Sequence, residues 1–280
     1  MTGCLYVVAT PIGHLDDISP RALAILKSVD VILAEDTRHS QRLLQHYQIN
    51  ANLQAFHDFN EQQQTPGLIA RLQEGQQLAL ISDAGTPLIS DPGYRLIDQA
   101  HLAHIQVSPI PGACAAITAL SAAGLPTDAF HFMGFLASKP SQRRQDLASI
   151  ASYPHTVIAY EAPHRILDSV SDIQHVLGDD RQIVLARELT KRFETIYRDT
   201  ASNCYEWLTR DPQQQKGEFV ILIAGVGQSD EALAQQRLQR AQTIYGWLKA
   251  EMPMSKAVKL AAKIAGANKN QLYEWALDDG

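Results

Sequence analysis

Residues 78–93 read LALISDAGTPLISDPG, an apolar run that leads directly into a loop of glycine, proline and hydroxyl side chains. The short, continuously apolar run Leu78–Ile81 followed by Ser82 predicts a buried β-strand over Leu78–Ser82. In the loop that follows, glycines allow the backbone to approach a ligand closely, and prolines reduce the entropy lost when the loop closes on it. This stretch therefore predicts a strand that ends in a ligand-binding loop.

The same order of strand and loop occurs twice more. Leu5–Ala9 leads into TPIGHLDDIS (Thr10–Ser19), and the strand Ile105–Ile110 runs into the loop PIPGA (Pro109–Ala113). Because ligands bind at the carboxyl ends of strands in open α/β sheets, the three loops predict one site at one sheet edge. Alternatively, the glycines and prolines only turn the chain. That would easily account for one such loop, but less easily for three at the same sheet edge. None of them is GxGxxG or GxxxxGK[ST], which disfavours a dinucleotide or P-loop nucleotide site.

Strands and helices alternate through residues 1–123, which predicts an N-terminal α/β domain with a mostly parallel sheet and the cofactor loops. The turn-rich segment Gly124–Asp128 is the expected domain boundary. Besides the three strands above, the expected elements are strands Val31–Ala34 and Leu53–Phe56, helices Ser19–Val29, Thr65–Gln73, Pro92–Leu102 and Ala115–Ala123, and an amphipathic stretch to about Tyr47.

Residues 124–227 predict a second α/β domain with fewer helices between its strands. The expected strands are Phe130–Leu136, Thr156–Tyr160, Ile183–Glu188, Thr195–Arg198 and Phe219–Ala224. The third and fourth are close enough in sequence for a hairpin, so this sheet is expected to be mixed or antiparallel.

Residues 228–280 predict a helical tail resembling a helix-turn-helix, although any helical hairpin has the same pattern. Pro253 ends a first amphipathic helix and Ser255 can cap a second. Gly266 and Asn268 separate the second helix from a last one, Asn270–Leu277.

The composition is that of an ordinary globular protein, with 45% hydrophobic and 19% charged residues. The three cysteines have no metal-ligand spacing, and no metal site is predicted. No apolar run approaches the ~18–20 residues that span a bilayer, and no charged-then-apolar leader precedes Cys4. We therefore expect a soluble cytoplasmic protein without a membrane partner.

Charge is unevenly distributed along the chain. Between Arg237 and Lys269 lie seven Lys/Arg and one acid, Glu251, a local balance of +6; since the whole chain carries −6, the remainder carries −12. A basic tail on an acidic body fits a protein that contacts a polyanion with one part and performs chemistry with another. A solvated helix face would carry the same charges.

Several motifs in a fixed order give the chain a family resemblance. They are TPIGHLDDIS, AEDTR (34–38), SDAGTPLISDPG, PGACAAITALSAAGLP (111–126), YEAPHR (160–165) and ARELTK with Glu194 (186–194). Together they resemble the ribosomal small-subunit (16S) RNA (cytidine 2'-O)-methyltransferases of the tetrapyrrole-methylase superfamily. Corrin and porphyrin methylases share that fold without this combination. The tail is similar to that family's C-terminal helix-turn-helix segment.

The resemblance implies a two-domain tetrapyrrole-methylase-like α/β fold, a homodimer, and S-adenosyl-L-methionine bound between the two α/β domains. It also implies methyl transfer to the ribose 2'-hydroxyl of a cytidine in the decoding region of small-subunit ribosomal RNA, free or in the assembled subunit. His14 stands where the family usually has Asn. Matched motif by motif, the implied cofactor contacts are Thr10, Pro11, Gly13, Asp83, Ala84, Gly85, Thr86, Pro87, Ser90, Asp91, Pro111, Gly112 and Ala113.

Such a transfer needs alignment of an activated methyl group and a base for a weakly nucleophilic hydroxyl. Asp36, which follows a strand at the same edge, is the candidate for orienting the hydroxyl or accepting its proton; alternatively it caps a helix. Arg38 could bind a phosphate. Lys191 could be a base only if burial or cationic neighbours lowered its pKa, and with Glu194 it could equally belong to a surface ion-pair network. His57 is a second candidate base.

Basic residues are candidates for phosphate contacts that position RNA without reading its sequence. They are Lys139, Arg143 and Arg144 in a polar loop, Arg165 and Arg187 from the second domain, and Lys256, Lys259 and Lys263 on one side of a tail helix. Two other interpretations remain open. One is a small-molecule methyltransferase acting on a tetrapyrrole-like substrate, and the other is a non-catalytic ribosome-binding protein with a degenerate cofactor fold.

Overall fold

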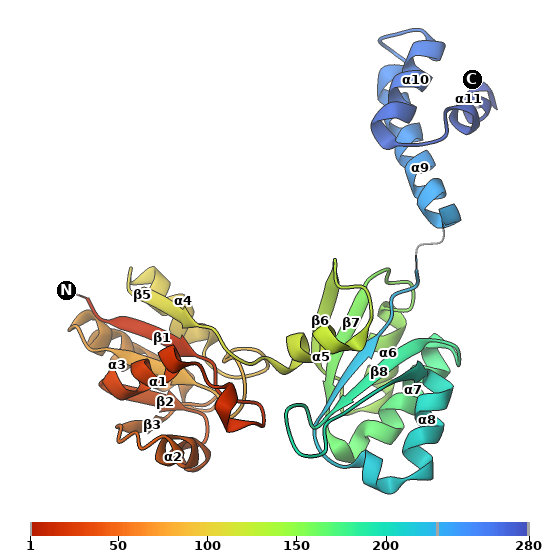
Figure 1. The fold of residues 1–280 in the computed structure, drawn as a ribbon. Coiled ribbons are helices and arrows are strands. Elements are labelled where there is room, and N and C mark those ends of the chain that lie inside the picture. The colour runs from red at the N-terminus through yellow and green to blue at the C-terminus, as the bar shows by residue number, and fades with distance from the viewer. Residues whose placement is uncertain (1, 228–229, 279–280) are drawn as a thin grey trace. The chain divides into compact units, whose positions relative to one another are not determined.

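The computed structural model describes residues 2–227 and 230–278 (Figure 1). The chain divides after Gly225 into two compact units. The larger unit contains two five-stranded sheets with their helices, and the smaller unit is helical. None of the helices in the described ranges is long and apolar enough to cross a membrane.

The first sheet is entirely parallel, with strand order β3-β2-β4-β1-β5. The parallel sheet predicted from the alternation of strands and helices is confirmed. Its strands are β1 (Cys4–Val8), β2 (Val31–Ala34), β3 (Leu53–Ala55), β4 (Leu78–Ile81) and β5 (Gln106–Ile110).

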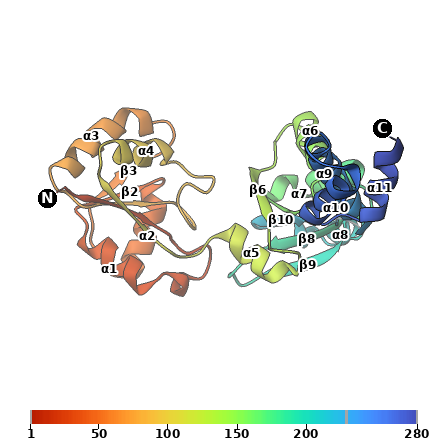
Figure 2. The same cartoon turned by 90° about the horizontal axis from the view of Figure 1, so that it is seen from above.

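Helices cover both faces of this sheet, which explains why β4 is apolar at every position (Figure 2). Leu78 and Leu80 pack with helices α3 and α4, whereas Ala79 and Ile81 pack with helices α1 and α2. The helices are α1 (Pro20–Ser28), α2 (Thr37–His46), α3 (Glu61–Gln73) and α4 (Tyr94–Leu102). Because the strands are parallel, the loops after all five begin at one edge.

Helix α3 begins at Glu61, four residues before the predicted start at Thr65. The glutamate is buried because its Oε1 accepts hydrogen bonds from the amides of Arg95 (2.9 Å) and Leu96 (3.4 Å) at the start of α4. These amides have no partner within their own helix, so the carboxylate satisfies donors that would otherwise be orphaned. The polar sequence of this first turn gave no apolar periodicity from which to predict it.

The second sheet has strand order β6-β7-β10-β8-β9. Strands β6 and β7 are parallel and the other neighbours antiparallel, so the predicted mixed sheet and the β8–β9 hairpin are confirmed. The strands are β6 (Phe130–Phe135), β7 (Thr156–Glu161), β8 (Gln182–Arg187), β9 (Thr195–Thr200) and β10 (Phe219–Ile223).

In the described part of the chain, three α-helices lie between the strands of the second sheet and four between those of the first, so the expectation of fewer helices here is confirmed, although the individual helices were not predicted. Helices α6 (Pro140–Ser149), α7 (Ile166–Leu177) and α8 (Ala201–Arg210) pack against one face of the second sheet, and α5 (Ala115–Ala123) packs against the other. The predicted polar loop around residues 139–144 is therefore the start of α6. Its sequence, PSQRRQDLAS, is too polar to show a helical apolar pattern.

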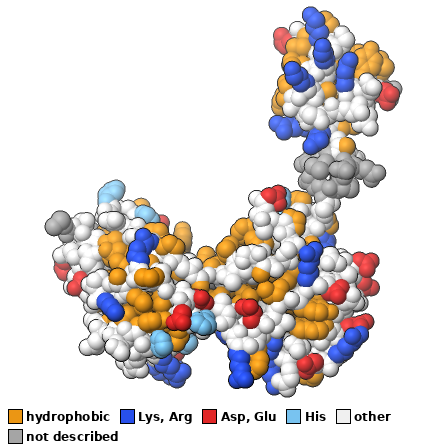
Figure 3. Space-filling view, viewed as in Figure 1, with side chains coloured by type: hydrophobic (Ala, Val, Ile, Leu, Met, Phe, Trp, Pro, Cys, Tyr) orange, Lys and Arg blue, Asp and Glu red, His pale blue; other side chains and the backbone are white. Residues whose placement is uncertain are grey.

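The smaller unit consists of α9 (Asp230–Leu248), α10 (Met254–Ala265) and α11 (Lys269–Asp278), packed around alanine and leucine side chains. Gly266 ends α10 in the left-handed conformation, and the Asn268 side chain accepts a hydrogen bond from the Asn270 amide (2.9 Å) at the start of α11. The predicted cap by Ser255 was wrong, because Pro253 is the N-cap and Ser255 lies in the first turn of α10. Lys and Arg side chains are prominent on the face of this unit seen in Figure 3.

Candidate active site

The loops after β1, β4 and β5 are bound to one another by hydrogen bonds. Thr10 and Gly85 exchange backbone bonds of 2.8 and 3.1 Å, and Gly85 has φ +85°, a value that favours glycine. The Thr86 hydroxyl donates to the carbonyl of Ala113 (2.9 Å), which joins the second loop to the third. The three loops predicted to form one site therefore meet at the carboxyl edge of the first sheet.

A cavity of about 420 Å³ opens at this edge, within the ~300–1,000 Å³ range of small-molecule sites. Residues from both halves of the larger unit line it. Those after β1, β4 and β5 include Ile12, Asp83, Ala84, Gly85, Thr86, Ile89, Ser90, Asp91, Cys114 and Ala115, and those from the second half include Phe135, Tyr160, Glu161, Leu189, Glu218, Phe219 and Val220.

The predicted cofactor residues divide into two groups. Asp83, Ala84, Gly85, Thr86, Ser90 and Asp91 line the cavity. Seven others lie outside the lining but within three residues of Ile12, Thr86 or Cys114, which belong to it: Thr10, Pro11, Gly13, Pro87, Pro111, Gly112 and Ala113. Gly112 illustrates their structural role, because a Cβ there would lie 2.8 Å from the Ala9 Cβ. A cofactor role for either group stays a prediction.

The second half contributes aromatic walls that the sequence did not reveal. Phe135 is 56% exposed, and its ring centroid lies 5.4 Å from that of Tyr160. The Tyr160 hydroxyl accepts a hydrogen bond from the Ala116 amide (3.2 Å), and burial raises the pKa of Tyr160 to about 12. Tyr160 begins the YEAPHR motif, but nothing in the local sequence of either residue pointed toward a ligand.

Carboxylates crowd the edge of the cavity. Burial and then the negative charges of Asp83 and Asp58 raise the pKa of Glu35, which follows β2. Burial and then the charge of Glu35 raise the pKa of Asp91 to about 7, although a hydrogen bond with Ser82 opposes the rise. Such crowding favours a cationic ligand and makes one carboxylate able to exchange a proton near neutral pH.

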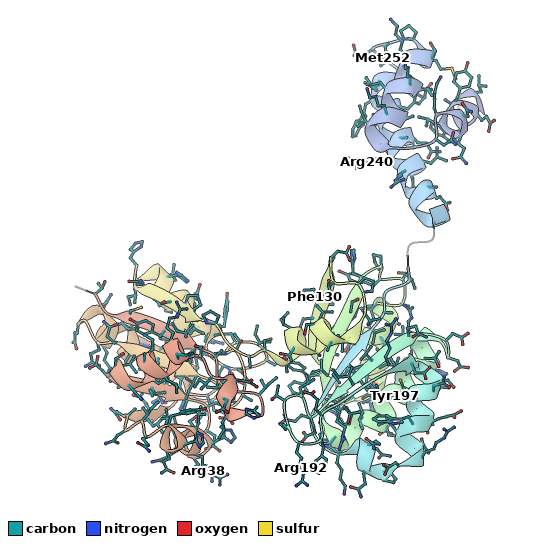
Figure 4. All side chains as sticks on the ribbon, in the orientation of Figure 1. Arg38, Phe130, Arg192, Tyr197, Arg240 and Met252 are labelled. Carbon is teal, nitrogen blue, oxygen red and sulfur yellow. The ribbon has the colours of Figure 1, made fainter. Side chains whose placement is uncertain are left out.

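Asp36 is placed as the N-cap of α2. Its Oδ1 accepts a hydrogen bond from the Arg38 amide (2.8 Å), and its Oδ2 lies 3.1 Å from the Arg38 guanidinium. Hydrogen bonds from Arg38 lower the pKa of Asp36 to about 2, which makes the carboxylate a weak base. Neither residue lines the cavity, and the Arg38 side chain extends into solvent from the start of α2 (Figure 4).

Lys191 and Glu194 hold together the loop between β8 and β9. The Lys191 ammonium lies 3.2 Å from Glu188 and 2.8 Å from Glu218. Burial lowers the pKa of Lys191, but hydrogen bonds and charge from these two carboxylates outweigh it and raise the pKa overall. The lowered pKa that a basic role would require is therefore absent. Glu194 accepts a hydrogen bond from the Thr190 amide (2.6 Å).

The TPIGH loop packs directly on this β8–β9 loop. A Cβ at Gly13 would lie 2.5 Å from Lys191 Cγ and 2.5 Å from Thr190 Oγ1, so only glycine fits without displacement. The His14 amide donates to the same Thr190 hydroxyl (3.0 Å). The exposed His14 ring accepts from the Asp16 amide (3.3 Å), a local bond that the amide oxygen of the family's usual Asn can also accept.

The structure argues against two of the predicted phosphate contacts, because the side chains of Arg143 and Arg187 are buried and bonded to protein partners. Arg143 is 2% exposed and pairs with Asp172 at 2.6 Å. Arg187 donates to the backbone carbonyls of Phe193, Gln213 and Lys216. The Arg165 guanidinium forms an ion pair with the buried Glu161 carboxylate, with 2.7 Å between Nη2 and Oε1.

The remaining basic candidates lie on the surface. Lys139 is exposed at the N-cap of α6, and the next helix turn presents the half-exposed Arg144. Lys256, Lys259 and Lys263 are exposed on α10, whose other side is buried in the smaller unit. These positions leave the charged groups accessible to a polyanion.

Comparison with known proteins supports the family resemblance along nearly the whole chain. Residues 4–204 match the family described as Tetrapyrrole (Corrin/Porphyrin) Methylases, and residues 234–280 match the RsmI C-terminal HTH domain. The chain belongs to the tetrapyrrole methylase family. The methylase is 52% identical over 276 residues to the ribosomal RNA small subunit methyltransferase I of Escherichia coli O157:H7, covering 99% of this chain and 95% of that protein. It is 51% identical over 277 residues to the protein of that name from Pseudomonas aeruginosa, covering 98% and 97%.

Solved structures with low sequence identity share the fold. A diphthine synthase has a TM-score of 0.60 at 14% identity, covering 79% of the methylase and 90% of the other chain. A uroporphyrin-III C-methyltransferase from Thermus thermophilus, complexed with S-adenyl homocysteine, has a TM-score of 0.55 at 13% identity, covering 79% and 97%.

The family assignment confirms three expectations from the sequence. The fold is that of a tetrapyrrole methylase, the chain is an enzyme that transfers methyl groups, and its methyl donor is S-adenosylmethionine.

Proposed function

We propose that the methylase transfers the methyl group of S-adenosylmethionine to the ribose 2'-hydroxyl of a cytidine in the decoding region of small-subunit ribosomal RNA. The observation that carries this proposal is the cavity formed where three hydrogen-bonded loops meet the second sheet. Relatives about half identical over nearly the full chain are named ribosomal RNA small subunit methyltransferase I, which supports the substrate class.

The residues around the cavity fit the methyl donor. Its wall combines apolar surfaces such as Phe135 and Val220, suited to an adenine ring, with the carboxylates of Asp83 and Asp91, suited to cationic groups. The loop Ser82–Gly93 would hold the polar parts of the donor through its amides and hydroxyls. When bound, the donor supplies a methyl group that is already activated for attack, so the enzyme's main task is to align the hydroxyl with it.

Exposed basic residues on both units would hold the RNA. Lys139 and Arg144 on α6 and the lysines of α10 are accessible, and phosphate contacts of this kind position a substrate without reading its bases. A basic helical unit is a feature that RNA binding uses and a small tetrapyrrole-like substrate does not need, which favours RNA. We further infer a cytoplasmic homodimer, as the family resemblance implies.

Mapping of ribose methylation tests the proposal directly. Small-subunit RNA from cells lacking the protein should lose one 2'-O-methyl cytidine, and a returned wild-type copy should restore it. In vitro, purified protein with radiolabelled S-adenosylmethionine should label small-subunit RNA, either free or in the assembled subunit, but not precorrin-type substrates. An unchanged methylation map together with labelling of a tetrapyrrole-like substrate would refute the proposed substrate.

A further inference from the structure

Four carboxylate side chains line the cavity among the residues that the structure describes, and three of them have structural partners. Glu161 is buried and bonded to Arg165 and to the Ala162 amide (2.7 Å). Glu218 is largely exposed and pairs with Lys191 (2.8 Å). The other two carboxylates belong to the loop after β4. They are Asp83, the third with a structural partner, and Asp91.

Asp83 is committed to loop structure, because its Oδ1 accepts a hydrogen bond from the Asp36 amide (3.0 Å). Asp91 has no Lys, Arg or His within ion-pair distance in the described part of the chain, and the nearby Ser82 hydroxyl, which lowers its pKa, donates to the carbonyls of Ala84 (3.4 Å) and Gly85 (3.3 Å). Of the four carboxylates, Asp91 is thus the one free to act on a ligand.

The backbone around Asp91 is held in an unusual conformation. Leu88 and Ser90 have φ of +71° and +70°, values that non-glycine residues rarely adopt and that cost energy unless the surroundings enforce them. Such strain is often found where a loop must direct a side chain into a site. Here it lies directly before the free carboxylate in the cavity wall.

We propose that Asp91 accepts the proton of the ribose 2'-hydroxyl during methyl transfer, an assignment that rests on the proposed function. In this step a bond forms between the ribose oxygen and the methyl carbon, and the methyl–sulfur bond breaks with its electron pair remaining on sulfur. The hydroxyl proton moves to a carboxylate oxygen of Asp91, from which it later leaves to solvent. Asp36, the sequence-based candidate, lies outside the cavity lining.

The electrostatic surroundings support this assignment. Burial and the charges of Glu35, Asp83 and Asp58 raise the pKa of Asp91 to about 7. The Ser82 hydroxyl opposes this rise. A base is most effective when its pKa lies near the working pH. A cation brought into the cavity would lower this pKa and keep Asp91 ionised at neutral pH.

Binding without RNA gives the first test. Affinities for S-adenosylmethionine and S-adenosylhomocysteine are measured by calorimetry from pH 5.5 to 8.5. Because the first carries a sulfonium charge, its affinity should rise with pH up to about 7, by at most tenfold per pH unit, and more steeply than that of the uncharged thioether. Asp91→Asn should remove this difference, Asp91→Glu should keep it, and Asp98→Asn, an exposed matched control on α4, should leave it unchanged.

Single-turnover methylation of small-subunit RNA with saturating donor gives the second test. Asp91→Asn should slow transfer by roughly 10²–10⁴-fold and flatten its pH profile, with less than tenfold loss of donor affinity at pH 8. Asp91→Glu should retain the pH dependence at an intermediate rate.

Two results would overturn the assignment. One is a single-turnover rate of Asp91→Asn within tenfold of the wild-type rate, and the other is a loss of donor affinity as large as the loss of rate. If the wild-type protein itself methylates no ribose, the proposed function fails instead.

Discussion

The backbone amide of Asp36 donates a hydrogen bond to Asp83 Oδ1 across 3.0 Å, so the loop after β2 is tied to the wall of the cavity. Asp36 itself caps α2 and has a pKa of about 2. The sequence alone could not separate a catalytic Asp36 from a capping one, and the structure supplies a contact for the second role. A substitution that keeps the cap but removes the carboxylate can distinguish the two.

We expect Asp36→Ser to retain methyl transfer and stability, because serine caps a helix as well as aspartate does. Asp36→Ala should lower the melting temperature by a few degrees and reduce transfer only as far as the loop is disturbed. Circular dichroism and a methylation assay on both variants check this. Abolished transfer in Asp36→Ser with intact donor affinity would instead make Asp36 a catalytic residue.

Gly13→Ala should weaken donor binding although Gly13 does not line the cavity. The added Cβ would lie 2.5 Å from Lys191 Cγ and Thr190 Oγ1, so the TPIGH loop must separate from the β8–β9 loop, at a cost of about 1–3 kcal/mol. Gly67→Ala in α3 is the matched control, because its Cβ meets nothing within 4 Å. Equal donor affinity and stability in the two variants would show that this packing does not matter.

The strands of the first sheet could be predicted because burial on both faces leaves a continuous apolar signal. Val31–Ala34 and Leu78–Ile81 are buried at every position, and both were expected as strands. The three loops were predictable for a related reason: glycine and proline mark them, and parallel strands place their ends together. The signals that predict these strands and loops therefore lie within short stretches of sequence.

Several features of the second half, including its wall of the cavity, could not be predicted, because they depend on contacts between distant segments. Arg143 meets Asp172 across 29 positions of sequence, and only that contact shows that it is structural. Likewise, Phe219 enters the wall because β10 inserts between β7 and β8, an order that no local pattern specifies. Helix α6 was missed since its one buried leucine, Leu147, gives no apolar period.

The contribution of Asp91 to the stability of the protein without donor should fall as pH rises from about 4 through about 7. The pKa of Asp91 is raised from 3.8 to about 7 in the folded state, so in this range the folded protein binds more protons than the unfolded chain. Deprotonation in the folded state therefore removes stability, and the loss levels off only well above pH 7, where the folded carboxyl is fully ionised. Urea titrations at several pH values measure this slope.

Asp91→Asn should remove that part of the slope, since the amide does not titrate. The exposed Asp98→Asn provides the control and should leave the pH dependence as in wild type. If both variants keep the wild-type slope, the carboxylate titrates no differently in the folded and unfolded states.

Arg143→Ala should destabilise the larger unit by about 3–5 kcal/mol, because it leaves the buried Asp172 carboxylate without its enclosed partner. Arg144→Ala removes the half-exposed partner of the same carboxylate and should cost less than about 1 kcal/mol. Chemical denaturation compares the two. RNA affinity, measured where both variants are folded, should fall only for Arg144→Ala; a fall for Arg143→Ala would restore its predicted role as a phosphate contact.

Removal of charge from α10 should weaken RNA binding without unfolding the smaller unit. Lys256, Lys259 and Lys263 are exposed, whereas the packing of α10 uses its buried alanines and Val258. The triple change to glutamine should lower the dependence of log affinity on log salt concentration by about 2–3, since each phosphate contact contributes roughly 0.7–0.9. Lys27→Gln, which removes one exposed charge from α1, serves as a control and should leave the slope unchanged. Deleting the residues after Gly227 should have at least the effect of the triple variant, and an unaltered salt slope in both would assign the unit to packing or dimerisation rather than to RNA.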